Sequence, residues 1–254
     1  MEFYRALDEG SHVDEAFIIP IGDTHIGDAG FNLKELKKTL DKGSQIGGLF
    51  VFTGDILNNG LKSSVSDTYD EVVPPGDPQI DFAYEIFKPY KNLIVGAVSG
   101  NHEYRSKKDA NMNPLRQLCH MLDVPFFGDE VLLQFRLGLK PNKKPVTYTA
   151  YVSHGCSNGR TVGAKANGLA RMTNIVMADI YFGAHTHQIL AYPLSIFVPD
   201  QHNLNVIEVE QWCVSNGGYL GRTGYPIRKN MRPVRIGSPT VRLDGRERRV
   251  EVTL

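Results

Sequence analysis

Short apolar runs alternate with amphipathic stretches along the first two thirds of the chain. Such runs, rich in β-branched and aromatic residues and closed by glycine or polar residues, are typical of buried strands. We expect strands over residues 17–21, 48–53, 93–98, 131–137, 146–152 and 180–182. Strands that alternate with helices along a chain indicate an α/β domain with a largely parallel sheet.

Helical periodicity and capping residues predict helices between these strands. Asn32 can cap a helix that runs to about Lys42 and places leucines on one face. Asp77 followed by Pro78 predicts a capped helix that runs to about Tyr90. We expect two further helices over residues 114–122 and 165–177.

Beyond Gln188 the pattern becomes β-rich, with strands expected over 189–198 and 204–209. A terminal hairpin is expected to turn at Asp244-Gly245. The sequence shows no internal repeat and no linker. We therefore expect one domain over residues 1–254, in which residues 203–254 form a basic, β-rich C-terminal segment.

The composition is that of an ordinary globular protein, with 254 residues, 41% hydrophobic and 22% charged. No apolar run reaches the roughly 20 residues of a membrane-spanning helix, and the acidic, polar start does not resemble a secretory signal. We expect no membrane partner. Cys119, Cys156 and Cys213 lack the paired spacing of a zinc site, so they indicate a reducing, cytoplasmic setting.

The net charge is zero, but the charges are unevenly placed. Between Leu220 and Leu254, nine basic residues stand against three acidic residues, which gives this segment a net charge of +6. A basic segment can bind a phosphate-rich partner. It can equally be a solvated hairpin with its arginines turned outward.

Polar residues gather directly after several of the predicted strands, in five clusters. The clusters are Gly22-Asp23-Thr24-His25, Gly54-Asp55, Gly100-Asn101-His102-Glu103, Ser153-His154-Gly155 and His185-Thr186-His187. Alone, each could be a turn or a pair of surface histidines. Together they supply carboxylate, imidazole and amide donors at strand ends, where ligands gather in α/β sheets. The ordered set predicts a centre for two metal ions.

This ordered set resembles the calcineurin-like metallophosphoesterases. Their pattern is Asp-x-His, Gly-Asp, Gly-Asn-His-[Asp/Glu], His, and Gly-His-x-His or Gly-x-His-x-His, and here the motifs span Gly22 to His187. The resemblance implies an α/β fold, a four-layer α/β/β/α sandwich of two mixed β-sheets flanked by helices. It would account for nearly the whole chain.

The resemblance also implies the ligands of two divalent metal ions. The first ion would have Asp23, His25 and His187, and the second would have Asn101, His154 and His185. Asp55 would bridge the ions, where a carboxylate screens their repulsion. Manganese is the metal we expect, and iron, zinc or nickel would also suit mixed oxygen and nitrogen ligands.

His102 follows an expected ligand and, with Asp55, is an expected catalytic residue. Protonated, it could hydrogen-bond a phosphate oxygen or give a proton to the leaving oxygen; alternatively, it caps its loop. Many family members orient this histidine with an Asp three residues after the bridging Asp, whereas here that residue is Asn58. Either Asn58 or Glu103 could orient His102.

The expected reaction is hydrolysis of a phosphoester by in-line attack of a metal-bound hydroxide. The Asp-Arg-Gly of phosphoprotein phosphatases is absent after Asp55, and the segment from Asp23 to Gly27 is similar to the Asp-x-His-[Leu/Ile]-Gly of double-strand-break repair nucleases. Arg105, Lys107 and Lys108 could bind a polyanion such as nucleic acid. The sequence therefore favours a phosphodiesterase, plausibly a nuclease.

Two other functions remain as alternatives. One is a phosphomonoesterase that acts on nucleotides or phosphoproteins. The other is a catalytically silent assembly subunit, against which the complete set of site residues argues. Trp212, Tyr219 and Tyr225 could form a subunit contact in a homo-oligomer, or an ordinary core patch.

Overall fold

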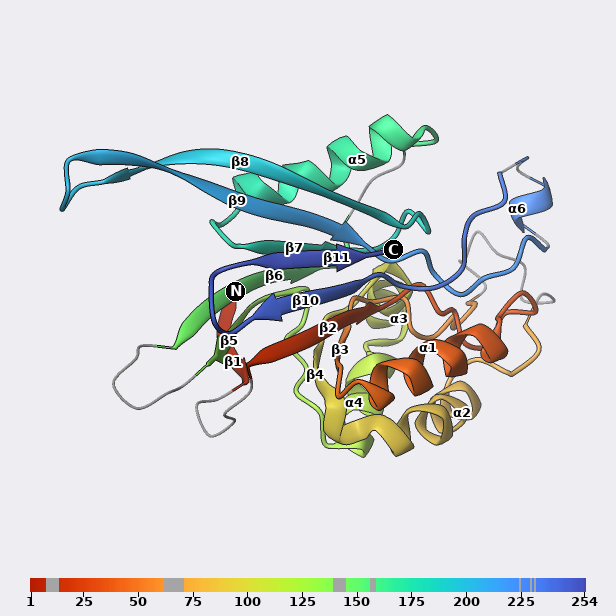
Figure 1. The fold of residues 1–254 in the computed structure, drawn as a ribbon. Coiled ribbons are helices and arrows are strands. Elements are labelled where there is room, and N and C mark those ends of the chain that lie inside the picture. The colour runs from red at the N-terminus through yellow and green to blue at the C-terminus, as the bar shows by residue number, and fades with distance from the viewer. Residues whose placement is uncertain are drawn as a thin grey trace.

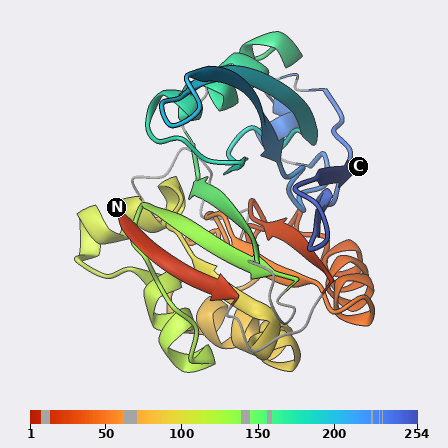
Figure 2. The ribbon, with the colours of Figure 1, turned by 60° about the vertical axis from the view of Figure 1, so that its left-hand side comes forward.

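The computed structural model describes residues 1–7, 14–61, 71–138, 145–155, 159–223, 225–228, 230 and 232–254. Two β-sheets pack face to face, and helices cover the outer face of each sheet (Figure 1; Figure 2). This is the four-layer α/β/β/α arrangement of two mixed sheets that the resemblance implies, so the expected fold class is confirmed.

The first sheet has five strands in the order β11-β10-β2-β3-β4. Its strands are β2 Glu15–Ile21, β3 Leu49–Phe52, β4 Ile94–Ala97, β10 Thr240–Asp244 and β11 Val250–Thr253. Strands β2, β3 and β4 run parallel, whereas β10 is antiparallel to β2. The three parallel strands therefore end at the same edge of the sheet.

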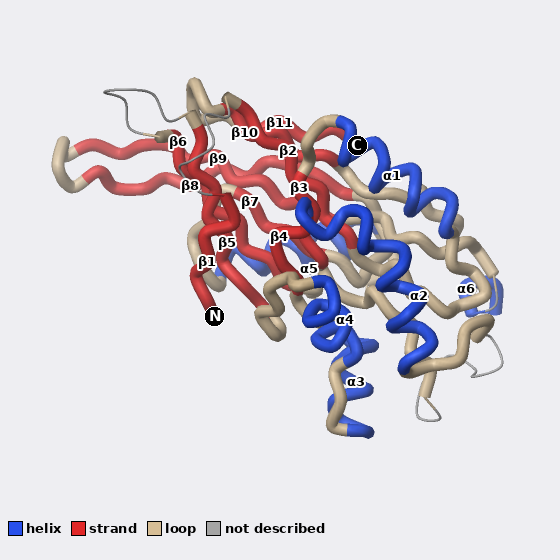
Figure 3. The backbone as a smooth tube through the Cα atoms, turned by 90° about the horizontal axis from the view of Figure 1, so that it is seen from below, coloured by secondary structure: helices blue, strands red, loops and turns tan. Residues whose placement is uncertain are grey.

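Four helices lie on this side of the molecule (Figure 3). They are α1 Leu33–Gln45, α2 Asp77–Phe87, α3 Asn101–Ala110 and α4 Pro114–Leu122, and a 3-10 helix over Lys88–Leu93 follows α2. Leu36 and Leu40, one turn apart on α1, are fully buried against Phe50 of β3 and its neighbours. Apolar faces of α2 and α4 complete this core layer.

The second sheet has six strands in the order β1-β5-β6-β7-β9-β8. They are β1 Glu2–Leu7, β5 Glu130–Leu137, β6 Val146–Ser153, β7 Ile180–Gly183, β8 Leu190–Asp200 and β9 Asn205–Ser215. Helix α5 Val162–Ala170 and a 3-10 helix over Arg171–Asn174 cover its outer face through Leu169 and Met172. The short helix α6 Tyr225–Arg228 follows β9. No helix among the described residues has the length and apolar character needed to cross a bilayer.

Most predicted elements form near their expected bounds, but three local predictions are wrong. Gly76, rather than Asp77, caps α2, with a φ of 85° and no side-chain hydrogen bond. The helix expected from residue 165 starts at Val162, because Thr161 caps it through the Ala164 N–H. The last hairpin has a longer loop than a two-residue turn, since β10 ends at Asp244 and β11 begins at Val250.

Strand β1 and helices α3 and α6 were not predicted from the sequence. Strand β1 has mostly exposed side chains, so it lacks an apolar signal, yet it pairs in parallel with β5. Helix α3 begins at Asn101, inside one of the polar clusters. Tyr219 is fully buried, and Trp212 lies in β9 against the core between the sheets, as the alternative of an ordinary core patch describes. Cys156 and the side chain of Tyr225 lie outside what the structure describes.

Candidate metal centre

All five polar clusters meet where the carboxyl ends of strands from both sheets come together. Asp23 and His25 follow β2, Asp55 follows β3, and Asn101 and His102 open α3 after β4. From the second sheet, His154 follows β6, while His185 and His187 follow β7. The two sheets thus contribute different members of one group of side chains.

Five of these residues have left-handed backbone conformations, which are rare outside glycine. Their φ angles are 48° at Asp23, 47° at His25, 51° at Asp55, 66° at His185 and 51° at His187. Each costs about 1–2 kcal/mol relative to a right-handed conformation. Because such conformations persist where the surrounding structure enforces them, often at functional sites, their grouping here supports a site with a specific geometry.

One group of donors consists of Asp23, His25 and His187, whose ligand atoms all lie within 4.8 Å of one another. His187 Nε2 is 3.7 Å from Asp23 Oδ1, and His25 Nε2 is 3.3 Å from His187 Nε2. Asp23 Oδ1 is buried and accepts no hydrogen bond from the described residues. A buried carboxylate oxygen without a donor is costly, and a cation at this point would satisfy it.

A second group consists of Asp55, His154 and His185, also within 4.8 Å. His154 Nε2 lies 3.3 Å from Asp55 Oδ2 and 3.1 Å from Asn101 Oδ1. His185 Nδ1 lies 2.8 Å from the same Asn101 oxygen. Since Asp55 Oδ2 is also 4.0 Å from His25 Nε2, this carboxylate lies between the two groups.

The electrostatics of the site centre on Asp55. Burial alone would raise its pKa, but His154 and His102 hold that pKa well below its usual range. Burial disfavours a charged His154, yet the Asp55 carboxylate raises the pKa of His154 to about 10. Burial and the neighbouring His102 hold the pKa of His25 well below its usual value. A nearby positive charge stabilises a buried carboxylate, and divalent cations bound by the surrounding imidazoles would supply that charge.

The residues present therefore fit a pair of divalent metal ions. Carboxylate oxygens, an amide oxygen and imidazole nitrogens are suitable donors for borderline divalent metals. Hydrogen bonds at the opposite ring nitrogens also orient two of the histidines. His154 Nδ1 donates to Thr53 O over 2.8 Å, and His25 Nδ1 donates to Asn58 Oδ1 over 3.2 Å.

Glu103 is a supporting residue whose role the sequence left open. Its buried carboxylate accepts hydrogen bonds from the backbone N–H groups of Asp55 (2.9 Å), Ile56 (3.0 Å) and Gly100 (2.8 Å). Burial and the charge of Asp55 raise the pKa of Glu103 to about 7. Glu103 thus fixes the loop that carries Asp55, and within the described part of the chain it forms no hydrogen bond with the ring of His102.

Asn216 is a second supporting residue, and the sequence reasoning missed it. It follows β9, is fully buried, and accepts a hydrogen bond from Thr53 Oγ1 over 3.0 Å. Its amide nitrogen lies 3.4 Å from Asp23 Oδ2, where it can donate. No motif marks this asparagine, because it approaches Asp23 only when the two sheets pack.

His102 is oriented by a backbone carbonyl. Its Nδ1 donates to Asn58 O over 2.5 Å, so neither of the two expected side chains is the partner. Its backbone N–H donates to Asp55 Oδ1 over 2.8 Å, and its Nε2 lies 3.9 Å from Asp55 Oδ2. Burial lowers the pKa of His102. His102 also belongs to a third donor group with His25 and Asp55, so the geometry is compatible with ligation as well as catalysis.

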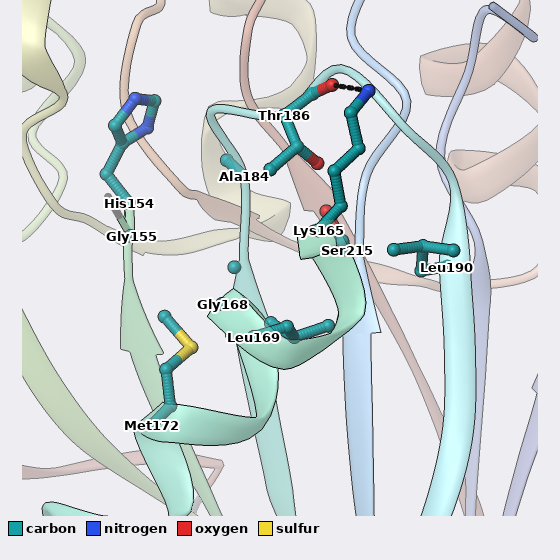
Figure 4. Close-up of a pocket in the computed structure, with 11 residues that line it drawn as sticks. His154, Gly155, Lys165, Gly168, Leu169, Met172, Ala184, Thr186, Leu190 and Ser215 are labelled. Atoms are coloured by element: carbon teal, nitrogen blue, oxygen red, sulfur yellow. Dashed lines mark hydrogen bonds between the residues drawn. The ribbon is translucent and has the colours of Figure 1, made fainter. Parts of the chain in front are cut away.

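A small pocket lies beside His154, between α5 and the loop that carries His185 and His187 (Figure 4). Lys165 of α5 reaches this loop and donates from Nζ to Thr186 O over 2.8 Å (Figure 4). Burial lowers the pKa of Lys165, whereas the charge of Asp23 raises it. Lys165 therefore places a basic group next to the candidate centre.

The basic residues after His102 differ in their surroundings. Lys107 and Lys108 are exposed, whereas Arg105 is partly buried one helical turn after His102. Its Nε and Nη2 are buried and have no hydrogen-bond partner within the described part of the chain. Burial lowers the pKa of Arg105, while Asp55 and Glu103 raise it. Of the three, Arg105 is the one placed near the donor groups.

Several C-terminal arginines form ion pairs with acidic residues. Arg242 forms ion pairs with Glu15 (2.8 Å) and Glu251 (2.9 Å), and Arg248 pairs with the buried Asp179. Arg246 pairs with Asp14 at 3.2 Å. For these residues the structure favours the solvated-hairpin interpretation of the basic segment.

Comparisons with known proteins give one family. Residues 18–189 match the family model described as calcineurin-like phosphoesterase. Similar solved structures include a metallophosphoesterase from Sphaerobacter thermophilus, with 14% identity, a TM-score of 0.42, and coverage of 93% of this chain and 87% of that chain. Vacuolar Protein Sorting 29 from Cryptosporidium parvum has 14% identity, a TM-score of 0.40, and coverage of 94% and 96%. No curated protein matches the sequence.

Proposed function

The chain belongs to the calcineurin-like phosphoesterase family, a family of phosphoester hydrolases, and from this premise we propose that it is a phosphodiesterase that depends on two divalent metal ions. The observation that supports this most is the position of Asp55 between two groups of donors. We propose nucleic acid as the substrate class and manganese as the native metal, with iron, zinc or nickel as alternatives.

In this proposal, each donor group holds one ion. Asp23, His25 and His187 would hold the first, Asn101, His154 and His185 would hold the second, and Asp55 would be available to both. When bound, such ions activate water as Lewis acids and neutralise charge on a phosphoryl group. His102, held by Asn58 O, would then present Nε2 to a phosphate oxygen or to the leaving oxygen.

Three features support a diester substrate over a monoester. Position 55 is not followed by the Asp-Arg-Gly of phosphoprotein phosphatases, and the chain has the closely spaced His185 and His187. Arg105 and Lys165 place basic groups near the donor groups. Two basic groups suit a substrate with several phosphates along a chain.

The test compares turnover of bis(p-nitrophenyl) phosphate with that of p-nitrophenyl phosphate, using metal-stripped protein to which Mn²⁺ is added. We expect faster cleavage of the diester, and loss of activity with a chelator. Faster cleavage of the monoester would move the assignment to a phosphomonoesterase acting on nucleotides or phosphoproteins. Bound metal without turnover of either compound would favour a silent assembly subunit.

We also propose a cytoplasmic location. Cys119 and Cys213 are buried free thiols, and burial raises their pKa values to about 12 and about 11. Thiols of this kind are unreactive, and unpaired cysteines are typical of reducing compartments. Fractionation of cells that express the protein would test this location.

A further inference from the structure

We propose that Asn58 and Glu71 are positioning residues that act in series on His25, and that the carboxylate of Glu71 is the reason for an amide at position 58. The inference rests on the role of His25 as a metal ligand in the proposed function. It concerns the position where many family members carry an aspartate, and it assigns the side chain of Asn58 a different task from orienting His102.

The contacts of Asn58 use both ends of its amide. Its Oδ1 lies 3.2 Å from His25 Nδ1, and its Nδ2 donates to Glu71 Oε1 over 2.8 Å. An amide oxygen only accepts and an amide NH₂ only donates. The NH₂ must face Glu71, so the oxygen must face His25, and His25 Nδ1 must carry the proton. The lone pair of His25 Nε2 then points toward His187 and Asp55, as a metal ligand requires.

Glu71 is itself held in place. Its Oε1 also accepts from the backbone N–H of Gly60 over 2.7 Å, and its Oε2 accepts from Gln79 Nε2 over 2.7 Å. Asn58 is 2% exposed, and its backbone N–H donates to Ile26 O over 2.9 Å. Because neither side chain is free to turn, the direction of the amide is fixed by contacts from several segments.

An aspartate at position 58 would keep the shape of the side chain and the contact with His25. It would also replace the donor that faces Glu71 by a second carboxylate oxygen. Two carboxylates in contact repel each other and disfavour their charged forms. Of an amide and an ionised aspartate, only the amide can accept from His25 and donate to Glu71 at the same time.

The test uses the charge-exchange series Asn58→Asp, Glu71→Gln and the double variant, with binding of Mn²⁺ measured by titration calorimetry at pH 8. We expect Asn58→Asp to weaken binding by about 10–100-fold, as is typical of residues that support a ligand. The double variant should bind more tightly than Asn58→Asp alone, because the repulsion is removed. Asn111→Asp, the same change at the exposed end of α3, is the matched control and should bind like the unaltered protein.

Affinity of Asn58→Asp equal to that of the unaltered protein would overturn the proposal. The proposal would also be overturned if the loss of binding free energy in the double variant equalled the sum of the losses in the two single variants, since groups that do not interact behave additively. Circular dichroism establishes that each variant is folded.

A second measurement needs neither metal nor substrate. Nitrogen NMR of the metal-free, unaltered protein should show His25 as the tautomer protonated at Nδ1; protonation at Nε2 would refute the proposed order of contacts. Because these readouts do not involve ester hydrolysis, a protein that binds metal but cleaves no ester would contradict the proposed function and leave this inference intact.

Discussion

Asp55 is a buried carboxylate that lies close to three imidazole rings. Its carboxylate is 2% exposed and lies within 4.0 Å of ring nitrogens of His25, His102 and His154. Around it, Glu103 fixes the backbone, and the left-handed conformation of Asp55 itself aims the side chain into the group. At the residue scale, we therefore expect the proposed function to depend on the charge of Asp55.

Replacing Asp55 by Asn should abolish hydrolysis and weaken metal binding by more than roughly 100-fold. Loss of a residue that only supports a ligand already weakens metal binding by about 10–100-fold, and Asp55 is an expected ligand itself. The amide keeps the volume but removes the charge shared by both donor groups. Metal content by mass spectrometry and diester turnover are the measurements. Near-native turnover would remove Asp55 from the site.

Replacing His102 by Ala should leave metal content intact and lower turnover by about 10²–10⁴-fold, the range of general acid–base catalysis. The hydrogen bond of its ring goes to the Asn58 carbonyl rather than to one of the expected ligand side chains. The same two measurements apply. Loss of bound metal in this variant would instead identify His102 as a ligand or a structural support.

At the scale of elements, the site depends on the contact between the start of α3 and the loop after β3. Both carboxylate oxygens of Glu103 accept hydrogen bonds from backbone N–H groups. Oε2 accepts from Asp55 and Gly100, and Oε1 accepts from Ile56. Gly100 has no room for a side chain, because a Cβ there would lie 2.2 Å from Asp55 Oδ1. These contacts join the loop after β3 to the start of α3 so closely that the position of one sets that of the other.

Glu103→Gln should therefore lower the free energy of unfolding by roughly 3 kcal/mol, because its NH₂ would face N–H donors whichever way it turns. Urea denaturation with chelator at pH 8, above the pKa of about 7 of this carboxyl, isolates the effect from metal binding. Glu85→Gln, on the exposed side of α2, is the matched control. Equal stability of the two variants would contradict the role of Glu103.

At the scale of the whole molecule, the candidate centre lies where the two sheets meet. Asp23 and Asp55 come from the five-stranded sheet, and His154 and His187 come from the six-stranded sheet. The C-terminal segment 203–254 contributes β9 to one sheet and β10 and β11 to the other. We propose on this basis that residues 1–254 form one domain.

Bound metal should consequently stabilise the whole fold. A ligand present at 100 times its Kd adds about 2.7 kcal/mol per site, which corresponds to a rise in Tm of about 5–10 °C for a chain of this size. Differential scanning calorimetry with Mn²⁺ and with chelator measures the difference. An unchanged Tm in a protein shown to bind Mn²⁺ would mean that the centre does not link the sheets.

The sequence by itself determined most strands, most helices and the residues that could bind metal. Apolar runs, the Asn32 cap and the order of the five clusters are local features that need no knowledge of packing. The family match over residues 18–189 confirms the family that these features suggested. The assignment of the individual ligands stays a prediction.

Only the tertiary structure decided how the candidate site is supported. Thr53 and Asn216 are 163 residues apart, and Glu71 and Asn58 are 13 residues apart, so neither contact leaves a periodic or motif signal. The sequence suggested that the Asn58 side chain orients His102. In the folded chain, the backbone carbonyl of Asn58 binds His102, and its side-chain amide binds His25 and Glu71. The reason is physical: a chain specifies its own apolar pattern locally, whereas the partner of a buried polar group is set by whichever distant segment packs against it.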